Sequence, residues 1–339
     1  MSIIPVEVPT GAIRYNTDSN KMECFNGTKW YQISVNSPDL NGGVRGVFPG
    51  GGSTIVNTID YITISTQGNA TDYGDLANPR NSGACFNSRT RGIVAGGENP
   101  SQTATMEYFA MASGGTSASF GNLTLSRRAF SGSGVASPTR GCSAGGYAAP
   151  AWTNIIDYVT IASTGNAIDF GDLTWVGATT CGSFTNGIRA LLGGGQSPSV
   201  GDSNIIQQIT ITTTGNAVDW GDLTLARSGT APASNGIRGL WGGGGAHPAR
   251  YNTIDYIEIA TQGNAMDFGD MTTSNARFAA ESSVRAVFAG GYDHPGGNAM
   301  NNMEYNSFAT KSNSVDFGDL GVVDARGGGR GFSNGHGGL

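Results

Sequence analysis

One pattern recurs six times along the chain, and this repeat limits the fold more than any other feature of the sequence. Its clearest copy is IDYIEIATQGNAMDFGDM at residues 254–271. The aromatic residue near the end of each copy falls at steps of 47, 50, 50, 48 and 49 residues, at Tyr73, Phe120, Phe170, Trp220, Phe268 and Phe317. A period near 50 built of short alternating runs is typical of a propeller or a related β array.

Each repeat contains four short runs with the character of β-strands. In the second repeat we predict strands at 85–88, 91–97, 106–112 and 118–124. Four strands per unit is the pattern of a propeller blade. Phe332-Ser333-Asn334-Gly335 matches the first strand of other repeats, whereas the strand that starts at Arg45 has no such partner before it. We therefore predict an all-β, six-bladed β-propeller over 41–339, whose first blade is closed by the C-terminal strand.

The repeat resembles a known family. A glycine pair after an apolar strand, an aromatic residue in the next strand, and a second aromatic residue followed by arginine together resemble the kelch repeat, from about Gly42 to the C-terminus. The sequence departs from kelch because a D-[YFW]-G-D box replaces the usual tryptophan. The resemblance therefore implies the fold rather than any kelch activity.

Residues 1–40 lie outside the repeat, and we predict a small β-hairpin module followed by a linker. Strands are expected at 12–16, 21–25 and 29–33, with Asn26-Gly27 as a tight turn. A module this short buries little core alone and needs a partner surface or copies of itself. The segment resembles a short hairpin of bacteriophage tail-fibre and other virion proteins, at Arg14-Tyr15-Asn16, Asn20-Lys21, Phe25-Asn26-Gly27 and Trp30. That resemblance implies a virion location and attachment to other virion proteins through Arg14, Tyr15, Asn16, Phe25, Trp30 and Tyr31.

Strand order predicts that the two ends of the propeller differ. If four strands alternate in direction, the first and third connections of each blade lie at one end and the second connection lies at the other. The third connections are short and uniform (TQGN, STGN, TTGN), whereas the second connections differ in length and chemistry, as at 98–105, 196–204 and 293–302. Because the chain enters the first blade at its second strand, we expect residues 1–40 at the uniform end.

The varied connections carry the aromatic and polar side chains expected of a surface that contacts a host glycan or protein. Two histidines, each followed by proline, occupy equivalent connections in adjacent blades. We predict a receptor-binding surface that consists of Tyr147, Trp152, His247, Arg250, Tyr251, Tyr292, Asp293 and His294.

Three recurrent sets are expected to have structural roles. Aspartates of the D-[YFW]-G-D box should accept backbone N–H bonds in a turn rather than bind a metal; they are Asp75, Asp172, Asp222, Asp270 and Asp319. Arginines at the start of each second strand should pair with the Asp boxes of neighbouring blades rather than form an anion site; they are Arg45, Arg91, Arg140, Arg189, Arg238 and Arg285. The six aromatic residues of the repeat should pack between blades.

Composition disfavours several other functions. A net charge of −6 and a pI near 5.0 provide no basic footprint for nucleic acid. The chain has no run of about 20 apolar residues for membrane insertion. Its four cysteines, Cys24, Cys85, Cys142 and Cys181, lack metal-type spacing and are expected to be buried thiols. With three histidines and no Ser/His/Asp spacing, nucleophile elbow or sialidase-type Asp box, we expect no enzyme, cofactor or metal site.

The sequence is compatible with three functions. The first is a bacteriophage tail-fibre or appendage component that docks through residues 1–40 and presents the propeller loops to a host receptor. A capsid decoration protein, or another structural virion protein without a receptor, would use the same fold. A polysaccharide depolymerase would need clustered carboxylates in the channel or among the loops. A homo-oligomer is compatible with each of them.

Overall fold

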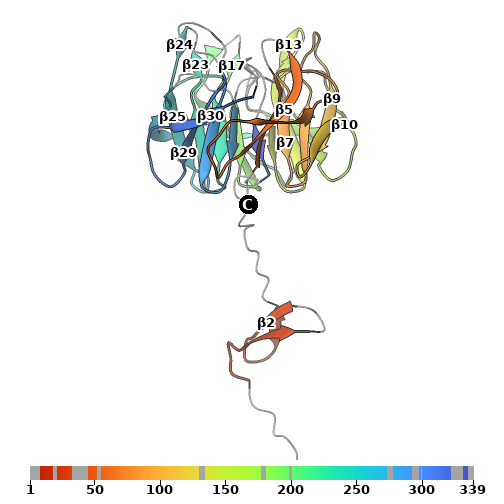
Figure 1. Ribbon diagram of the computed structural model, residues 1–339, viewed down its shortest axis with the longest axis vertical. Helices are drawn as coiled ribbons and strands as arrows, with labels where there is room; N and C mark the ends of the chain where they lie inside the picture. The colour runs from red at the N-terminus through yellow and green to blue at the C-terminus, as the bar shows by residue number, and fades with distance from the viewer. Residues whose placement is uncertain are drawn as a thin grey trace, which may run out of the picture. The chain divides into compact units, whose positions relative to one another are not determined.

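The computed structural model describes residues 8–17, 21–32, 45–51, 55–129, 134–176, 181–197, 201–246, 248–272, 278–291, 298, 300–321 and 331–334. These residues form β-strands and no α-helix (Figure 1). None of them therefore belongs to a helix that could cross a membrane. The chain divides into two compact units, Met1–Leu40 and Asn41–Leu339.

The smaller unit is a three-stranded antiparallel sheet. Its strands, in spatial order, are β1 (Ile13–Asn16), β2 (Lys21–Phe25) and β3 (Trp30–Gln32). The turn between β2 and β3 forms because the Asn26 side-chain oxygen accepts the backbone N–H groups of Thr28 and Lys29, each at 3.0 Å. Gly27 has a φ of +96°, a conformation that glycine adopts at little cost. The three predicted strands are confirmed, and the first and third are slightly shorter than expected.

The larger unit contains six four-stranded antiparallel sheets, with these strands in spatial order. The first sheet has β31 (Phe332–Ser333), β4 (Arg45–Gly51), β5 (Val56–Thr63) and β6 (Thr71–Asp75). The second has β7 (Ala84–Asn87), β8 (Arg91–Ala95), β9 (Thr105–Ala110) and β10 (Gly114–Asn122). The third has β11 (Gly134–Ala136), β12 (Arg140–Ala148), β13 (Ala151–Thr160) and β14 (Ile168–Asp172).

The other three sheets repeat this order. The fourth has β15 (Gly182–Thr185), β16 (Arg189–Gly193), β19 (Ile205–Thr210) and β20 (Val218–Asp222). The fifth has β21 (Ala231–Ser234), β22 (Arg238–Gly242), β25 (Thr253–Glu258) and β26 (Met266–Asp270). The sixth has β27 (Phe278–Glu281), β28 (Arg285–Ala289), β29 (Asn302–Ser307) and β30 (Val315–Asp319). Two small hairpins, β17 (Gln196–Ser197) with β18 (Gly201–Asp202) and β23 (Gly245–Ala246) with β24 (Ala249–Arg250), lie in the connections of the fourth and fifth sheets.

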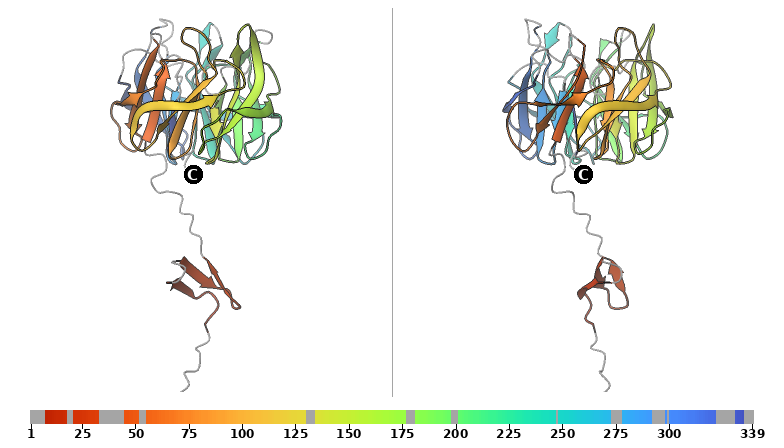
Figure 2. Two further views of the ribbon diagram at one scale, coloured as in Figure 1. Left: turned by 90° about the vertical axis from the view of Figure 1, so that its right-hand side faces the viewer. Right: turned by 45° about the vertical axis from the view of Figure 1, so that its right-hand side comes forward.

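The first strands of the six sheets contact one another in a closed cycle: β7, β11, β15, β21, β27, β31 and back to β7. Figure 2 shows the sheets side by side, with their strands running between the two ends of the unit. The cycle closes through the predicted strand from the C-terminal region. In that pairing, Phe332 lies opposite Val47 and Ser333 opposite Gly46.

The core of the larger unit lies between neighbouring sheets. One cluster combines Ile156 and Phe170 of the third sheet with Leu192 and Ile209 of the fourth, and all four side chains are buried. Equivalent clusters join the other sheets. The predicted packing of the repeated aromatic residues between sheets is confirmed, because each belongs to such a cluster. Three of the four cysteines, Cys85, Cys142 and Cys181, are buried as predicted, whereas Cys24 is half-buried.

The predicted role of the Asp box is wrong in its details. The box lies within the fourth strand of each sheet rather than in a turn, as in β14, and its backbone makes the contacts. The Asp172 N–H donates to the Asn216 side chain at 3.0 Å, and its carbonyl accepts the Ala217 N–H at 2.7 Å. Gly171 has a φ of +143°, and a Cβ there would lie 2.6 Å from the Gly215 backbone. The box therefore requires glycine for a close approach between sheets.

The predicted partners of the repeated arginines are also wrong. Arg140 donates from Nη1 to the Ile211 carbonyl of the next sheet at 2.8 Å, and its guanidinium lies 4.4 Å from the centre of the Tyr158 ring. Each of the other five likewise donates to a carbonyl of the following sheet: Arg45, Arg91, Arg189, Arg238 and Arg285. The guanidinium suits this position because its planar fork combines a directed donor with stacking on an aromatic face.

A second arginine set, which the sequence reasoning missed, forms the buried ion pairs between sheets. Arg127 and Asp157 lie 3.0 Å apart with at most 1% of either side chain exposed, and Arg227 and Asp255 are similarly buried at 3.1 Å. Arg80 pairs with Glu107 in the same way. Burial lowers the pKa of Arg127 and of Arg227, and the nearby aspartate opposes that shift.

Candidate functional site

The connections between the second and third strands, called the varied loops below, differ from sheet to sheet. In the third sheet, β12 and β13 continue into a long hairpin in which Tyr147 pairs with Trp152 and Ala148 with Ala151. The fourth and fifth sheets carry the separate hairpins β17–β18 and β23–β24. These hairpins lie at one end of the larger unit, together with the end of β13 (Figure 1).

A groove of about 560 Å³ lies between the varied loops of the second and third sheets. It is lined by Glu98, Pro100, Ser101, Gln102, Leu125, Ser126, Ala148 and Ala149. The two loops are joined across it because the Ala149 N–H donates to the Gln102 side-chain oxygen at 2.8 Å. Small-molecule sites in proteins typically enclose about 300–1,000 Å³, so this groove is large enough for one or two sugar rings.

An ion pair and two aromatic rings lie next to this groove, beside its lining residues Glu98 and Ala148. Arg128 donates to Glu98 at 2.6 Å, and both side chains stay partly exposed. The Arg128 guanidinium lies 5.2 Å from the centre of the Tyr147 ring, and that ring lies 5.0 Å from the Trp152 ring at an interplanar angle of 60°. Backbone hydrogen bonds between Arg128 and Tyr147 in both directions hold these two residues side by side. Glu98, Arg128, Tyr147 and Trp152 are called the groove cluster below.

Sequence reasoning found only half of the groove cluster. Tyr147 and Trp152 were predicted, whereas Arg128 and Glu98 were missed. Arg128 is hard to recognise in the sequence because it directly follows Arg127. Arg127 is the residue that forms a buried ion pair, like the arginines at the same position of other repeats. Only the structure shows that the two adjacent arginines serve different purposes.

The other predicted receptor residues do not join this cluster. Arg250 lies in β24, in the varied loop of the fifth sheet, and the Tyr251 N–H donates to the Gly244 carbonyl of the same loop at 2.9 Å. Both side chains are half-buried, and the fourth sheet lies between the third and the fifth in the cycle. His247, Tyr292, Asp293 and His294 lie outside the described residues. The structure therefore separates the predicted surface into at least two places.

The predicted attachment residues lie on both faces of the small sheet. Arg14 donates to Glu23 at 2.8 Å and its guanidinium lies 4.1 Å from the centre of the Trp30 ring, which is itself 5.3 Å from the Phe25 ring. Asn16 also donates to Glu23, at 3.0 Å. These hydrogen bonds, that from Arg14 above all, lower the pKa of Glu23.

The register of the three strands shows on which face the other two predicted attachment residues, Tyr15 and Tyr31, lie. It places the side chains of Tyr15 and Tyr31 on the opposite face from Arg14, because direct cross-strand partners share a face and successive residues alternate.

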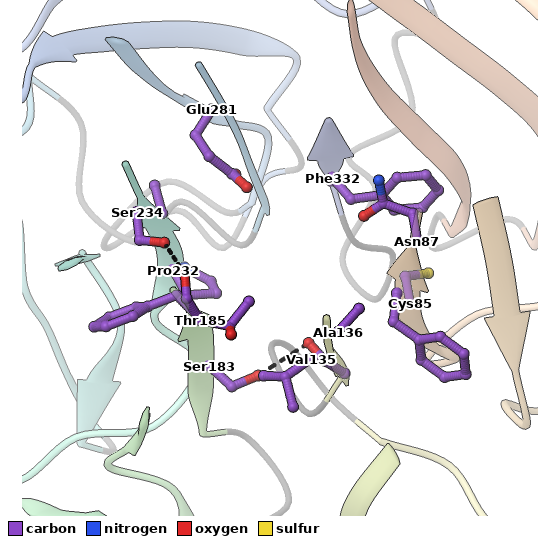
Figure 3. A pocket seen from close by; sticks show the side chains of 15 residues that line it. Cys85, Asn87, Val135, Ala136, Ser183, Thr185, Pro232, Ser234, Glu281 and Phe332 are labelled. Carbon is purple, nitrogen blue, oxygen red and sulfur yellow. Dashed lines mark hydrogen bonds between the residues drawn. The ribbon is translucent and has the colours of Figure 1, made fainter. Parts of the chain in front are cut away.

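A narrow channel runs between the first strands of the six sheets, with a cavity of about 50 Å³ lined by residues from all of them. Figure 3 shows the Glu281 side chain pointing toward its open centre. Burial raises the pKa of Glu281 to about 8. The cavity holds a few water molecules at most, so it is too small for a sugar ring.

Among the described residues, no group of three or more His, Cys, Asp or Glu side chains is placed to hold a metal ion. No protein-family model matches the chain, and no curated protein matches its sequence.

Proposed function

We propose that this protein is a bacteriophage virion component, part of a tail fibre or a similar appendage, that binds a host surface. In this proposal the larger unit is a six-bladed, kelch-like β-propeller, residues 1–40 attach it to other virion proteins, and the varied loops contact the receptor. Six four-stranded sheets whose first strands contact in a closed cycle support the propeller. The hairpin resemblance of residues 12–33 supports the virion setting.

The contrast between the two ends of the larger unit carries the receptor proposal. Connections between third and fourth strands are held by the preceding sheet, as when Gly215 donates to the Phe170 carbonyl and Asn216 accepts the Asp172 N–H. We attribute their uniform sequences to these shared hydrogen bonds. The varied loops share backbone contacts where they begin, as when Gly97 donates to the Arg127 carbonyl and Gly195 to the Arg227 carbonyl, whereas their sequences beyond that point differ from sheet to sheet. Binding residues are commonly carried by such loops on a rigid scaffold.

The groove cluster favours a saccharide as the ligand. Tyr147 and Trp152 are half-exposed and offer aromatic faces on which the C–H face of a sugar can stack. Glu98 and Arg128 supply acceptors and donors for hydroxyl groups while their charges compensate each other. A neutral or weakly acidic surface polysaccharide matches this combination, and the net charge of −6 does not favour a polyanion.

Binding without hydrolysis is the form of the proposal that the geometry supports. Glycoside hydrolysis generally uses two carboxyl groups about 5–10 Å apart on either side of the bond that breaks. The carboxylate among the residues that line the described groove is Glu98, and it is paired with Arg128. Glu281 lies in a channel too small for a sugar.

The proposal can be tested with the purified full chain and host cells. The double variant Tyr147→Ala, Trp152→Ala should bind host cells at least tenfold more weakly. Thr261→Ala is a matched control, because Thr261 is exposed in a uniform connection and only its backbone N–H is hydrogen-bonded, to Glu258. The control should bind like the parent protein.

Two results would count against the proposal. Unchanged adsorption by the double variant would remove the groove cluster from the receptor site and favour a capsid decoration role. Release of reducing sugar ends from host polysaccharide by the parent protein would favour the depolymerase.

A further inference from the structure

A second cavity lies on the other side of the varied loop of the second sheet. It has a volume of about 210 Å³ and lies between that loop and the connection that leads from β6 to β7. Ser101 lines both the groove and this cavity, so the two spaces meet at that residue. The cavity is called the polar pocket below, and its polar lining residues are Asn78, Arg80, Asn99, Ser101, Thr103 and Thr105.

Backbone hydrogen bonds hold both walls of the polar pocket in place. Asn81 donates to the Glu98 carbonyl at 3.2 Å and Glu98 donates back at 3.0 Å, which ties the β6–β7 connection to the varied loop. Within that loop, the Thr103 N–H donates to the Gly97 carbonyl at 3.0 Å. Because the walls are already ordered, a ligand that enters between them loses little binding free energy to ordering the protein.

Two exposed asparagine side chains keep their amide oxygens for a ligand. Asn78 donates from Nδ2 to the Glu107 carboxylate at 2.8 Å, and Asn99 donates from Nδ2 to the Pro79 carbonyl at 3.0 Å. A carboxylate and a carbonyl only accept hydrogen bonds, so these contacts fix which end of each amide is the nitrogen. Within the described part of the chain, no donor reaches the Oδ1 atom of either asparagine. Both oxygens can therefore accept hydrogen bonds from a ligand.

The rest of the polar lining consists of hydroxyl groups and one charge that is already compensated. Ser101 and Thr105 are exposed, and the hydroxyls of Thr103 and Thr105 lie 3.0 Å apart in a hydrogen bond. The Arg80 guanidinium forms its buried ion pair with Glu107. The polar pocket therefore offers neutral acceptors and hydroxyls. These groups suit the hydroxyls of an uncharged sugar, whereas the amide oxygens disfavour a carboxylate or a phosphate.

The sequence sets this place apart from the equivalent places in other repeats. Asn78 stands two positions before the buried Arg80, whereas Leu125 and Leu225 stand two positions before Arg127 and Arg227. Leucine at the equivalent positions shows that the fold does not require an amide there. The amide therefore gives the polar pocket a chemistry that the repeat itself does not explain.

We infer that the polar pocket is a second saccharide subsite, and that one glycan chain crosses Ser101 to occupy the groove and the polar pocket together. The inference rests on the proposed function, because it extends the same binding surface. The two spaces together stay within the roughly 300–1,000 Å³ of ligand sites. A sugar unit in the groove lies beside Tyr147 and Trp152, whereas a unit in the polar pocket is held by hydrogen bonds alone. The ligand is then an uncharged segment of a polysaccharide rather than a single terminal sugar.

Fragments of graded length test this inference on the full chain. The probes are uncharged, size-fractionated fragments of the host surface polysaccharide, from one sugar unit upward, and titration calorimetry measures their Kd. We expect the affinity of the parent protein to increase with fragment length until both cavities are filled. The increase should be at least tenfold, which corresponds to about two hydrogen bonds in the polar pocket.

The double variant Asn78→Leu, Thr105→Val removes polar atoms of the pocket with little change to the fold. Leucine occupies the equivalent position in other repeats, and valine keeps the β-branched shape at the first residue of β9. The variant should bind long fragments at least tenfold more weakly than the parent does. It should bind the shortest fragments, which fill only the groove, as tightly as the parent.

Leu225→Asn is the matched control, because it makes the reverse exchange at the equivalent position of another repeat. Leu225 is 38% exposed and belongs neither to the groove nor to the polar pocket. This variant should bind fragments of every length like the parent protein.

The pattern of loss separates this inference from the proposed function. If the pocket variant keeps its affinity for long fragments while Tyr147→Ala with Trp152→Ala loses it, the second subsite is wrong and the proposed function stands. An equal loss for short and long fragments would mean that the pocket variant disturbs the groove, and it would also overturn the second subsite. A parent protein that binds no fragment would overturn both.

Discussion

The backbone N–H of Arg45 donates to the side-chain oxygen of Asn334 at 3.1 Å, across 289 positions of sequence. The Asn334 N–H donates back to the Arg45 carbonyl at 3.2 Å. These bonds lie beside the two residue pairs that join β31 to β4. The first and last described strands of the larger unit, β4 and β31, are therefore held in one sheet. The cycle of six sheets depends on β31, a strand of two residues.

Phe332→Ala should destabilise the larger unit by about 3–5 kcal/mol. Phe332 is 5% exposed and stacks on Phe109 of the second sheet with ring centres 5.9 Å apart, so its removal opens the contact between the first and second sheets. Thermal or denaturant unfolding measures the loss. Truncation after residue 334 leaves β31 in place and should have little effect. A loss below about 1 kcal/mol for Phe332→Ala would show that β31 does not hold the cycle together.

Arg140→Lys should destabilise the protein by about 1–2 kcal/mol, with little dependence on salt. The lysine keeps the charge but loses the planar contact with Tyr158 and the directed bond to the Ile211 carbonyl. Arg238→Lys provides the comparison, because Arg238 also pairs with the partly exposed Glu258 at 2.7 Å. Its loss should shrink at high salt, where exposed ion pairs are screened. An equally salt-sensitive loss at Arg140 would restore the ion-pair interpretation.

Gln207→Glu should destabilise the protein by about 2–4 kcal/mol at pH 7, because it places an unpaired carboxylate in a fully buried position. In the native protein the Gln207 carbonyl oxygen accepts both the N–H and the hydroxyl of Thr174, each at 2.6 Å. Lowering the pH toward 5 should restore stability as the new carboxyl is protonated.

A second variant tests whether a buried ion pair can be restored at the contact between the third and fourth sheets. Leu173 is followed after four positions by Gly177, where the repeats of Arg80, Arg127 and Arg227 have arginine. Adding Gly177→Arg to Gln207→Glu should recover much of the lost stability. Failure of this rescue, with the single variant also neutral, would contradict the role assigned to the buried pairs.

Glu281 should make the protein less stable as pH rises. Its pKa is about 8 in the folded chain, against 4.5 for an ordinary glutamate, so the folded state binds the proton more tightly. Stability is then greatest below about pH 4.5 and falls between about 4.5 and 8, by at most about 1.4 kcal/mol per pH unit. Glu281→Gln should flatten this dependence in a melting-temperature series from pH 5 to 8. Parallel curves for the two proteins would show that the channel hydrates the carboxylate.

Much of the fold could be predicted from the sequence because each repeat contains runs with strand periodicity, separated by turn residues. The position of β31 and its partner β4 followed from comparing Phe332-Ser333-Asn334 with the start of other repeats. The partners of Arg140 could not be predicted, since a backbone carbonyl leaves no mark on the sequence. The prediction from charge alone therefore paired Arg140 with an aspartate of the Asp box, whereas its partner is the Ile211 carbonyl.

The buried ion pairs did leave a mark that the sequence reasoning overlooked. Where arginine stands four positions after the repeat leucine, the next sheet carries an acid, as in Arg127 with Asp157 and Arg227 with Asp255. Where glycine replaces it, the acid becomes Gln207. The groove cluster was harder to find because Glu98 and Tyr147 come from different sheets, and only their packing brings them to Arg128.

A reconstruction of the virus particle with this protein in place tests the central claim most directly. We predict that residues 13–32 lie against other virion proteins and that the varied loops, with Tyr147 and Trp152, point away from the particle. A particle in which those loops are buried against the virion, while the uniform connections face outward, would contradict it.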